Sequence, residues 1–118
     1  MTNDLFASVE QSTRARRVLV TGAGGAAGVA VIRSLRTGSL INGATHRVTA
    51  TDCDPHAAGL ALAHDGFVSP PASSPSFART LIQRCRSHRI EALITTVAEE
   101  IEALRAAAPE LEIGRAHV

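Results

Sequence analysis

The sequence has few aromatic side chains and no excess of charge of either sign. Tryptophan and tyrosine are absent, and aromatic residues, all phenylalanine, make up 3% of the 118 residues. Nucleic-acid bases would therefore find little to stack on. Twelve basic and eleven acidic side chains leave a net charge of +1, and the basic run at 14–17 is too short for a nucleic-acid footprint. These absences argue against a nucleic acid as the partner.

Cysteine and long apolar runs are scarce as well. Two cysteines, Cys53 and Cys85, do not make a disulfide framework, so both are predicted to be reduced thiols. Residues 1–11 contain two acidic side chains and lack the apolar core of a signal peptide. No segment approaches the roughly 18 consecutive apolar residues of a membrane span. We expect a cytoplasmic protein with no membrane partner.

What is present is enough apolar side chain, 45% of the residues, to bury the core of one domain. Three segments are predicted: a flexible leader at 1–16, a folded domain at 17–111 and a non-native tail at 112–118. The tail, from Glu112 to Val118, is what one reading frame of a widely used sequencing adapter encodes. We therefore expect the natural protein to continue beyond residue 111. Composition leaves its oligomeric state open.

Strand-like and helix-like segments alternate along the predicted domain. Short runs of aliphatic and β-branched residues predict strands at 18–20, 47–52, 67–68 and 92–96. Four helices are predicted. The first runs from the glycines to residue 37 and would end at Gly38, and the second runs from Asp54, which would cap it, to residue 66. The third begins at residue 77, and the fourth spans 99–108. This alternation predicts an α/β fold, a Rossmann-like open parallel sheet of about four strands with helices on both faces.

The helix predicted from residue 77 has one apolar face. Leu81, Ile82 and Cys85 recur at helical spacing, and the arginines of this segment lie off their face. We expect the apolar face to pack on the sheet and the arginines to be solvated.

The most informative stretch joins the first strand to the first helix and contains Gly22, Gly24, Gly25 and Gly28. Gly22 is expected to take a tight turn with positive φ, and Gly24 or Gly25 to allow close approach of a ligand or a neighbouring loop. Gly28 would let the helix pack closely on the strand. The helix N-terminus offers free amides to a phosphate or carboxylate. We predict that these four glycines bind a cofactor, with a plain tight turn as the alternative.

Acidic and hydroxyl side chains follow two of the predicted strands. Asp52 ends the second strand, where an acid in such folds binds a ribose or another polar ligand. A loop-capping role for Asp52 is the alternative. Thr95 and Thr96 end the fourth strand, and Glu99 and Glu100 follow. We predict that Asp52 binds a cofactor and that Thr95, Thr96 and Glu99 bind substrate; glutamates in a first helical turn also complement the helix dipole.

No metal site is predicted. Cys53 and His56 could supply two ligands, with His64 further along the chain, but no second pair follows at zinc spacing. No Ser-His-Asp or Cys-His arrangement can be argued from spacing either. We therefore assign no catalytic residue.

Four blocks of residues stand in a particular order along the predicted domain. They are Val18–Gly25; Thr51–Pro55 followed by Ala58–Leu60; Pro70 and Pro71 with Pro75–Phe77; and Ile90–Val97 with Glu99 and Glu100. Together they resemble the N-terminal domain of an ATP-grasp ligase of the type related to the carbamoyl-phosphate synthase large subunit. The resemblance covers residues 17–111 and rests on the order and spacing of the blocks.

This resemblance implies a Rossmann-like pre-ATP-grasp domain that lines the substrate side of a cleft and is not catalytic alone. ATP and magnesium would bind between two later domains, outside this chain. The implied reaction activates a carboxylate as an acyl phosphate and joins it to an amine or another nucleophile, so the partner would be a small-molecule substrate. The glycine loop and Glu99 correspond to cleft-facing loops of that family. Ala98 is a departure, since relatives tend to carry an acid there.

A second family remains open. The spacing Thr21-Gly22-x-x-Gly25-x-x-Gly28 also resembles extended short-chain dehydrogenases and sugar-nucleotide epimerases, which bind NAD(P) on this loop. Asp52 would then bind the adenosine ribose. The strand at 93–97 lacks the small-residue, His-containing end typical of those enzymes, and the chain has no tyrosine for their Tyr-x-x-x-Lys pair. We prefer the ligase; a stand-alone binding module is the third hypothesis.

Overall fold

The computed structural model describes residues 15–42 and 45–109, without the side chains of 39–42. The predicted tail, and the predicted leader up to residue 14, lie outside the described residues. The elements in chain order are β1 (Arg16–Val20), α2 (Ala26–Asn42), β2 (His46–Asp52), α3 (Ala58–Leu62), β3 (Asp65–Val68), α4 (Phe77–Ser87), β4 (Ala92–Ile94) and α5 (Ala98–Ala106). None of the described helices is long and apolar enough to cross a membrane.

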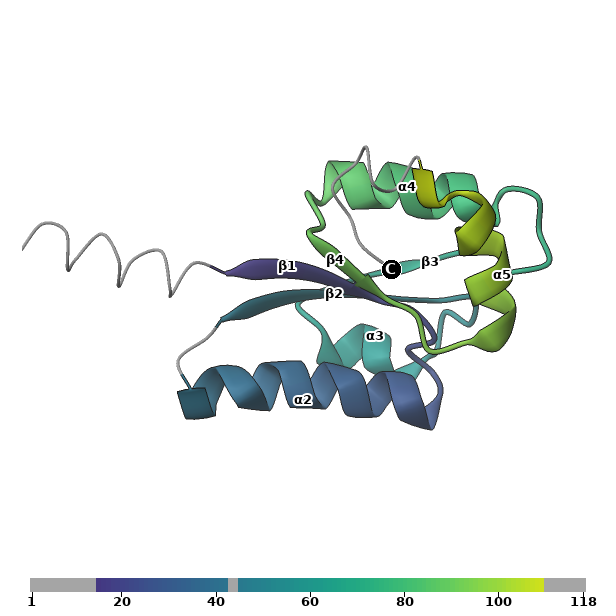
Figure 1. The fold of residues 1–118 in the computed structure, drawn as a ribbon. Helices are drawn as coiled ribbons and strands as arrows, with labels where there is room; N and C mark the ends of the chain where they lie inside the picture. The colour runs from purple at the N-terminus through teal and green to yellow at the C-terminus, as the bar shows by residue number, and fades with distance from the viewer. Residues whose placement is uncertain (1–14, 43–44, 110–118) are drawn as a thin grey trace, which may run out of the picture.

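The four strands form one parallel sheet in the order β3-β2-β1-β4 (Figure 1). β1 lies between two neighbours, with Val18 opposite Val48 of β2 on one side and opposite Ala92 of β4 on the other. The chain moves outward from β1 to β2 and β3, and then crosses to the far side of β1 for β4. The predicted Rossmann-like open parallel sheet is confirmed.

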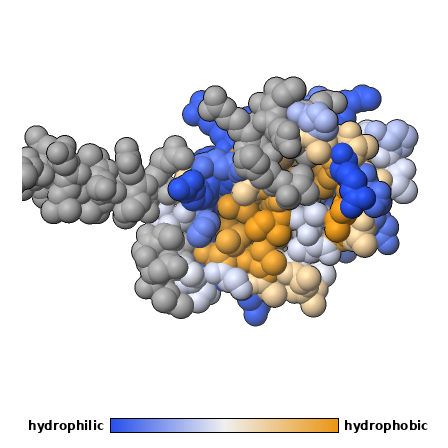
Figure 2. Space-filling model, in the orientation of Figure 1, coloured by the Kyte–Doolittle hydropathy of each residue, from blue (hydrophilic) through white to orange (hydrophobic). Residues whose placement is uncertain are grey.

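Helices cover both faces of the sheet, α2 and α3 one face, α4 and α5 the other (Figure 1). Side chains alternate along β1 between two buried clusters. Leu19 packs in a cluster with Phe77 of α4 and Leu104 of α5, here called the α4/α5 core, whereas Val20 packs in a cluster with Ile32 of α2, the α2/α3 core. Figure 2 shows apolar surface between α2 and the sheet on this side of the molecule. The central strands are thus buried on both faces, as parallel strands usually are.

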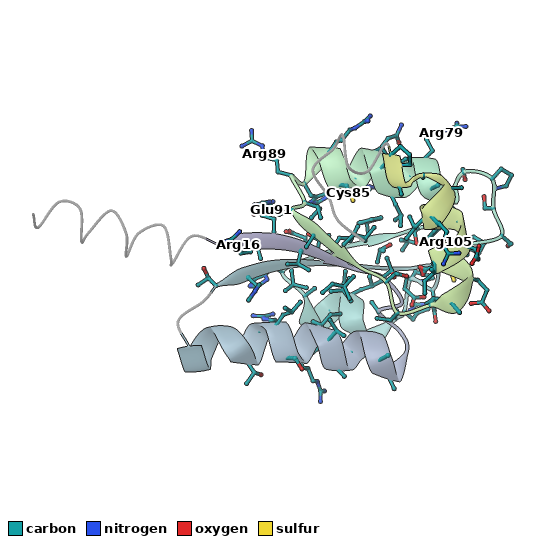
Figure 3. All side chains as sticks on the ribbon, viewed as in Figure 1. Arg16, Arg79, Cys85, Arg89, Glu91 and Arg105 are labelled. Carbon is teal, nitrogen blue, oxygen red and sulfur yellow. The ribbon has the colours of Figure 1, made fainter. Side chains whose placement is uncertain are left out.

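The amphipathic character predicted for α4 is confirmed. Leu81, Ile82 and Cys85 are buried, and the arginines of the helix are exposed. In Figure 3, Cys85 points from α4 toward the sheet and Arg79 points away from it. The guanidinium carbon of Arg84 lies 4.8 Å from the ring centroid of Phe67, so this arginine covers part of β3. The solvated face of α4 therefore also shields part of the core.

The end predicted for the first helix is wrong. We expected Gly38 to stop it in the left-handed conformation, but α2 runs on to Asn42, and Gly22 is the one described glycine with positive φ. A glycine inside a helix costs only about 1 kcal/mol relative to alanine. Packing of the apolar side of α2 on the sheet outweighs that cost, because most helical stability in proteins comes from such burial.

The second predicted helix is wrong at both ends. α3 spans only Ala58–Leu62, and Asp65 and Gly66 begin β3 instead of ending a helix. Asp54 does not cap α3; its carboxylate accepts a hydrogen bond from the amide of His56 at 2.9 Å. Such local side-chain bonds hold the backbone in a turn and compete with helix formation.

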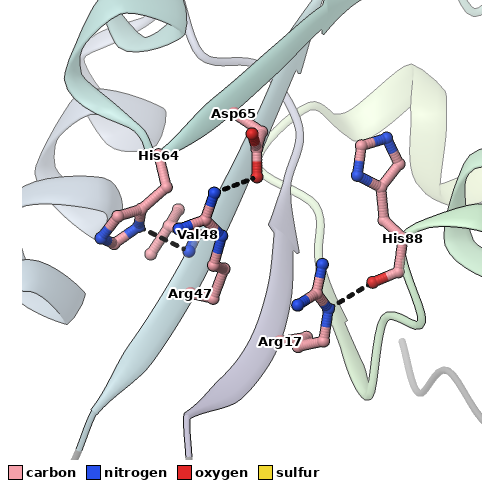
Figure 4. A network of polar contacts seen from close by, with 6 residues as sticks. All are labelled: Arg17, Arg47, Val48, His64, Asp65 and His88. Carbon is pink, nitrogen blue, oxygen red and sulfur yellow. Dashed lines mark hydrogen bonds and ion pairs between the residues drawn. The ribbon is translucent and has the colours of Figure 1, made fainter.

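Polar contacts at the amino end of the sheet join its strands to one another and to the connections around them (Figure 4). Arg47 pairs with Asp65 across β2 and β3 at 3.1 Å, and Arg17 donates to the carbonyl of His88. The amide of Val48 donates to Nδ1 of His64 at 3.0 Å. Burial lowers the pKa of His64, and the nearby arginines lower it further. The lowered pKa favours the neutral ring, in which Nδ1 can accept this hydrogen bond. These contacts secure the sheet and lie opposite its carboxyl end.

Candidate functional site

The carboxyl end of the sheet is where this topology places a ligand. The strand order reverses beside β1, since β2 follows on one side of it and β4 lies on the other. Open α/β sheets bind ligands in the crevice outside the carboxyl ends of the strands at such a reversal. The segments that emerge there are the glycine loop after β1, the turn after β2, residues 69–73 after β3 and the threonines after β4.

Two glycines of the loop are required by the fold itself. Gly22 has φ of +65°, and a Cβ there would collide with the Thr96 hydroxyl. A Cβ at Gly28 would collide with the carbonyl oxygen of Gly22, because the first turn of α2 lies directly on the loop. The tight turn predicted at Gly22 and the close packing predicted at Gly28 are confirmed.

Asp52 ties the glycine loop to the end of β2. One carboxylate oxygen accepts from the amide of Gly24 at 2.8 Å, and the other accepts from the amide of Asp54 at 2.8 Å. A Cβ on Gly24 would lie 3.1 Å from the same carboxylate. Gly24 therefore permits close approach of a neighbouring loop, and the loop-satisfying alternative predicted for Asp52 is what its hydrogen bonds show. Each oxygen keeps a second lone pair, so these two bonds do not prevent Asp52 from accepting from a ligand hydroxyl as well.

Gly25 differs from its neighbours in the loop. It is exposed, its φ is not positive, and a Cβ there would meet nothing nearer than the Gly22 carbonyl at 3.6 Å. The fold therefore does not require glycine at this position. Its amide donates to the carbonyl of Gly22 at 3.1 Å, and its carbonyl accepts from Val29 at 3.0 Å, so its backbone begins α2.

The amides of the loop are largely occupied. Those of Ala23, Gly24 and Gly25 donate to Thr51, Asp52 and Gly22 respectively. The amides at the start of α2 itself, those of Ala26, Ala27 and Gly28, are the ones that a helix leaves free for an anion. Binding of NAD(P) at this loop stays a prediction.

The threonines after β4 are joined to Thr21 at the end of β1. The Thr21 hydroxyl donates to Oγ1 of Thr95 at 3.1 Å and accepts from the amide of Thr96 at 3.3 Å. The Thr96 hydroxyl donates to the Thr21 carbonyl at 2.9 Å. The proton of Thr96 is thus taken by the backbone, whereas that of Thr95, a half-buried residue, has no acceptor among these contacts.

Glu100 is the buried acid of this edge. It is 7% exposed and lies in the first turn of α5. Burial raises its pKa to about 7, against the lowering effect of Thr21, and the negative charges of Asp52 and Glu99 raise it further. A carboxyl group with this pKa exists in both protonation states near neutral pH, which is the property expected of a group that exchanges a proton at a site.

A pocket of about 640 Å³ opens at this edge, on the side of the sheet that α4 and α5 cover. Its wall combines strand ends, the loop after β3 and the start of α5. The lining residues are Gly22, Asp52, Cys53, Ser69, Pro70, Pro71, Ala72, Ser73, Phe77, Val97, Glu99, Glu100 and Glu102. A cavity of this size is typical of small-molecule sites.

The charged side chains that line the pocket are all acidic. Asp52, Glu99, Glu100 and Glu102 line it, and no arginine or histidine does so among the residues that the structure describes. Carboxylates repel phosphates and attract ammonium groups and other hydrogen-bond donors. Apolar walls at Pro70 and Phe77 would cover the uncharged part of such a ligand. The lining therefore attracts cationic groups and hydrogen-bond donors.

The residues considered for a metal do not come together. Cys53 and His56 follow the carboxyl end of β2, whereas His64 precedes β3 and lies at the amino end of the sheet. In the described part of the chain, no group of three or more acidic, histidine or cysteine side chains could hold a metal ion.

The structure gathers some of the predicted site residues and separates others. Gly22, Asp52 and Glu99 line the pocket, and Gly24 contacts Asp52. Five of the predicted residues lie outside the pocket lining: Gly24, Gly25, Gly28, Thr95 and Thr96. No ligand role of any of these residues is tested by the structure.

Sequence reasoning chose Glu99 from the acidic pair, and the structure buries Glu100 instead. Glu99 is exposed at the pocket rim, whereas Glu100 lies on the same face of α5 as the fully buried Leu104. The spacing of four residues between Glu100 and Leu104 was the signal that could have found it. Thr21 was missed for a similar reason, since alternation along β1 places it on the same face of the sheet as Leu19.

The two thiols should differ in reactivity. Cys53 is exposed at the pocket, whereas Cys85 is 1% exposed and burial raises its pKa to about 11. We expect one thiol to react with a disulfide reagent in the native protein and the second only after unfolding, because reaction needs an accessible thiolate. Absorbance of the released thiol measures both phases. Cys53→Ser should abolish the native phase; native reaction of both thiols at one rate would contradict the burial of Cys85.

Residues 18–116 match a family described as PylC-like, N-terminal domain. No curated protein matches the chain.

Proposed function

Because this chain belongs to the PylC-like N-terminal domain family, a pre-ATP-grasp domain type, we propose that it forms the substrate-side domain of an ATP-grasp ligase and is not catalytic alone. The observation that carries the proposal is the pocket at the carboxyl end of the sheet. It lies where an open α/β sheet binds its ligand, and it is formed by three strand ends and the start of α5. A specificity like that of carbamoyl-phosphate synthase rests on the four sequence blocks alone. The cytoplasmic location of the protein also stays a prediction.

ATP and magnesium would bind outside this chain. The pocket has four carboxylates and, among the described residues, no cationic side chain in its lining, so it would repel a triphosphate. When bound elsewhere in the ligase, ATP would supply the phosphoryl group that activates a carboxylate. The residues of this chain would bind and orient the other substrate and exclude water around it.

The substrate class that the pocket supports is a small molecule with an amine. Glu99 and Glu102 stand at the exposed rim and Glu100 at depth, so an ammonium group would be attracted by the rim and could reach a carboxyl group inside. Such a substrate agrees with a carboxylate–amine ligase, in which the amine attacks the activated carboxylate.

The first test concerns the gene. Sequencing the source gene across codon 111, by a method that adds no adapter, is expected to show a frame that continues into an ATP-grasp core. A frame that continues to a Tyr-x-x-x-Lys pair would refute the ligase and favour the dehydrogenase. A gene that ends at Val118 would favour a small binding module.

The second test uses the full-length product of that gene. Glu102→Arg should raise KM for the amine substrate by about tenfold, equivalent to about 1.4 kcal/mol, and leave KM for ATP unchanged. The reason is that the new cation lies at the rim of this pocket and not at the ATP site. Gln83→Arg, which places the same side chain on the exposed side of α4 and changes the net charge by one unit instead of two, serves as the control for a surface arginine. An equal rise in KM for ATP would contradict the assignment of the pocket to the other substrate.

A further inference from the structure

Glu100 is set apart from the other acids of the pocket by its burial. It is 7% exposed, whereas Glu99 and Glu102 are exposed on the same helix. Glu102 also pairs with Arg105 at 3.3 Å, and Asp52 accepts from two backbone amides. Glu100 is therefore the carboxyl group of the lining that water solvates least.

No cation offsets the charge of Glu100 in the part of the chain that the structure describes. The ion pairs found there all join other residues. The charged groups that act on Glu100 are Asp52 after β2 and Glu99 on its own helix, and both are negative; Glu102 and the Cys53 thiol also line the pocket. A buried carboxylate without a cation is costly. Its charge is best compensated by a cation that enters the pocket with a ligand.

The rest of the lining indicates which cation can reach Glu100. Apolar wall is contributed by Pro70, Pro71, Phe77 and Val97. A hydrocarbon stem would cover these walls, and a primary ammonium group at its end would offer three N–H donors to the carboxylate. The described acidic, histidine and cysteine side chains do not form a group that could hold a metal ion instead.

An ammonium group must lose a proton before its nitrogen can act as a nucleophile, because the protonated nitrogen has no lone pair. A primary amine such as that of lysine has a pKa of about 10.4 in water, far above that of an ordinary carboxyl group. Burial raises the pKa of Glu100 to about 7, and burial of the ammonium group would lower its own pKa. Both effects make proton transfer inside the pocket easier than in water.

We propose that Glu100 is a catalytic residue of the ligase: its carboxylate binds the ammonium group of the amine substrate and takes the proton that must leave before the nitrogen attacks the activated carboxylate. The inference rests on the proposed function, which supplies the amine and the acyl phosphate. It goes beyond that function by naming the group of this chain that holds the proton.

The step balances in protons and electrons. The ammonium group passes one proton to the Glu100 carboxylate, and the N–H bonding pair becomes the nitrogen lone pair. That lone pair forms the C–N bond at the acyl carbon, while the C–O bond to phosphate breaks and phosphate leaves with the electron pair. The departing phosphate takes the second proton from nitrogen. Glu100 returns its proton to water when the amide leaves.

The first test uses the present chain with n-butylamine as the probe, so it does not depend on the ligase assignment. In NMR spectra the side-chain carboxyl carbon of Glu100 should titrate with a midpoint of about 7 in the free chain. Saturating n-butylammonium should lower this midpoint by about one pH unit or more, because a cation in contact favours the ionised carboxylate. n-Butanol, which has the same stem without the charge, should not lower it. A midpoint that n-butylammonium leaves unchanged would overturn the proposal.

The second test uses the full-length ligase. Glu100→Gln should lower kcat for amide formation by about a hundredfold or more, as loss of a general base does. Hydroxylamine is largely uncharged at neutral pH and attacks an acyl phosphate without losing a proton first. The variant should therefore still form the hydroxamate at the unaltered rate. Glu91→Gln, which removes a carboxylate at the amino end of the sheet, is the matched control and should leave both rates unchanged.

The pH profile separates a base from a structural role. For the unaltered ligase, kcat/KM for the amine should rise with a midpoint of about 7, because this ratio reports the ionisation of the free enzyme. For Glu100→Gln the rise should continue toward the pKa of the amine itself, about 10 for an amine like that of lysine, since only the uncharged amine then reacts.

The outcomes distinguish this proposal from the function on which it rests. Amide formation by Glu100→Gln with unaltered kcat and pH profile would overturn the role of Glu100 and leave the ligase assignment in place. Loss of hydroxamate together with amide in this variant would overturn it too, because a base for the amine is not needed for hydroxylamine. Absence of hydroxamate from the unaltered ligase would refute the ligase assignment, and the proposal with it.

Discussion

Replacing Glu100 by glutamine is expected to stabilise the fold at pH 8 and to change its stability little at pH 4. The pKa of Glu100 is about 7 in the fold, against an ordinary value of 4.5. Folding therefore favours the protonated form, so the stability from this group is full below pH 4.5 and is lost as pH rises to about 7. One pH unit corresponds to roughly 1.4 kcal/mol, so the loss amounts to about 3 kcal/mol. Glutamine carries no charge to bury, so the Glu100→Gln chain avoids this loss of stability.

Urea denaturation at a series of pH values measures this effect. The unaltered chain should lose stability between pH 4.5 and 7, and the Glu100→Gln chain should lose less over the same interval. Glu102→Gln is the control, because Glu102 is exposed on the same helix and its charge is not among those that raise the pKa of Glu100. If Glu100→Gln shows the same pH slope as the unaltered chain, Glu100 is not the group that titrates.

Gly28→Ala is expected to destabilise the chain by about 3 kcal/mol or more, or to prevent folding. The added Cβ would collide with the carbonyl oxygen of Gly22 and crowd Cα of Ala23, at 3.1 Å. These atoms belong to backbone and cannot turn aside as a side chain can. Relief requires α2 to move away from the end of β1, which would open the α2/α3 core. The urea midpoint measures the loss.

Gly25→Ala is the matched control in the same loop. Its Cβ would lie 3.6 Å from the nearest atom, an ordinary contact, and its φ suits alanine. The stability of this variant should change by less than about 1 kcal/mol. Similar losses for the two variants would mean that the loop tolerates no side chain for a reason other than the contact at Gly28.

Much of the fold was predictable because its signals are local. Val18–Val20 is a short aliphatic run before glycine, and Leu81 and Cys85 recur at helical spacing on α4. Such patterns reflect burial of a strand or of one helix face, and they need no knowledge of distant segments. The turn at Gly22 was predictable for the same reason, since the requirement for positive φ is a property of one residue.

Helix ends were less predictable because several weak preferences compete there. Gly38 is a common stop signal, yet α2 passes through it, because the packing of the helix on the sheet outweighs the cost of one glycine. Asp54 is a common capping residue, yet its carboxylate is used within a turn. At both positions the residue allows two conformations, and contacts with other parts of the chain decided which one it adopts.

By itself the sequence determined the α/β class, the parallel sheet and the glycine turn, because each depends on the order and spacing of neighbouring residues. Only the tertiary structure decided that Asp52 braces the glycine loop and that acids after β2 and on α5 line one pocket. It alone brought the hydroxyls of Thr21 and Thr95 within hydrogen-bonding distance. Residues 74 positions apart meet there because parallel strands place their carboxyl ends side by side, a proximity that no local pattern encodes.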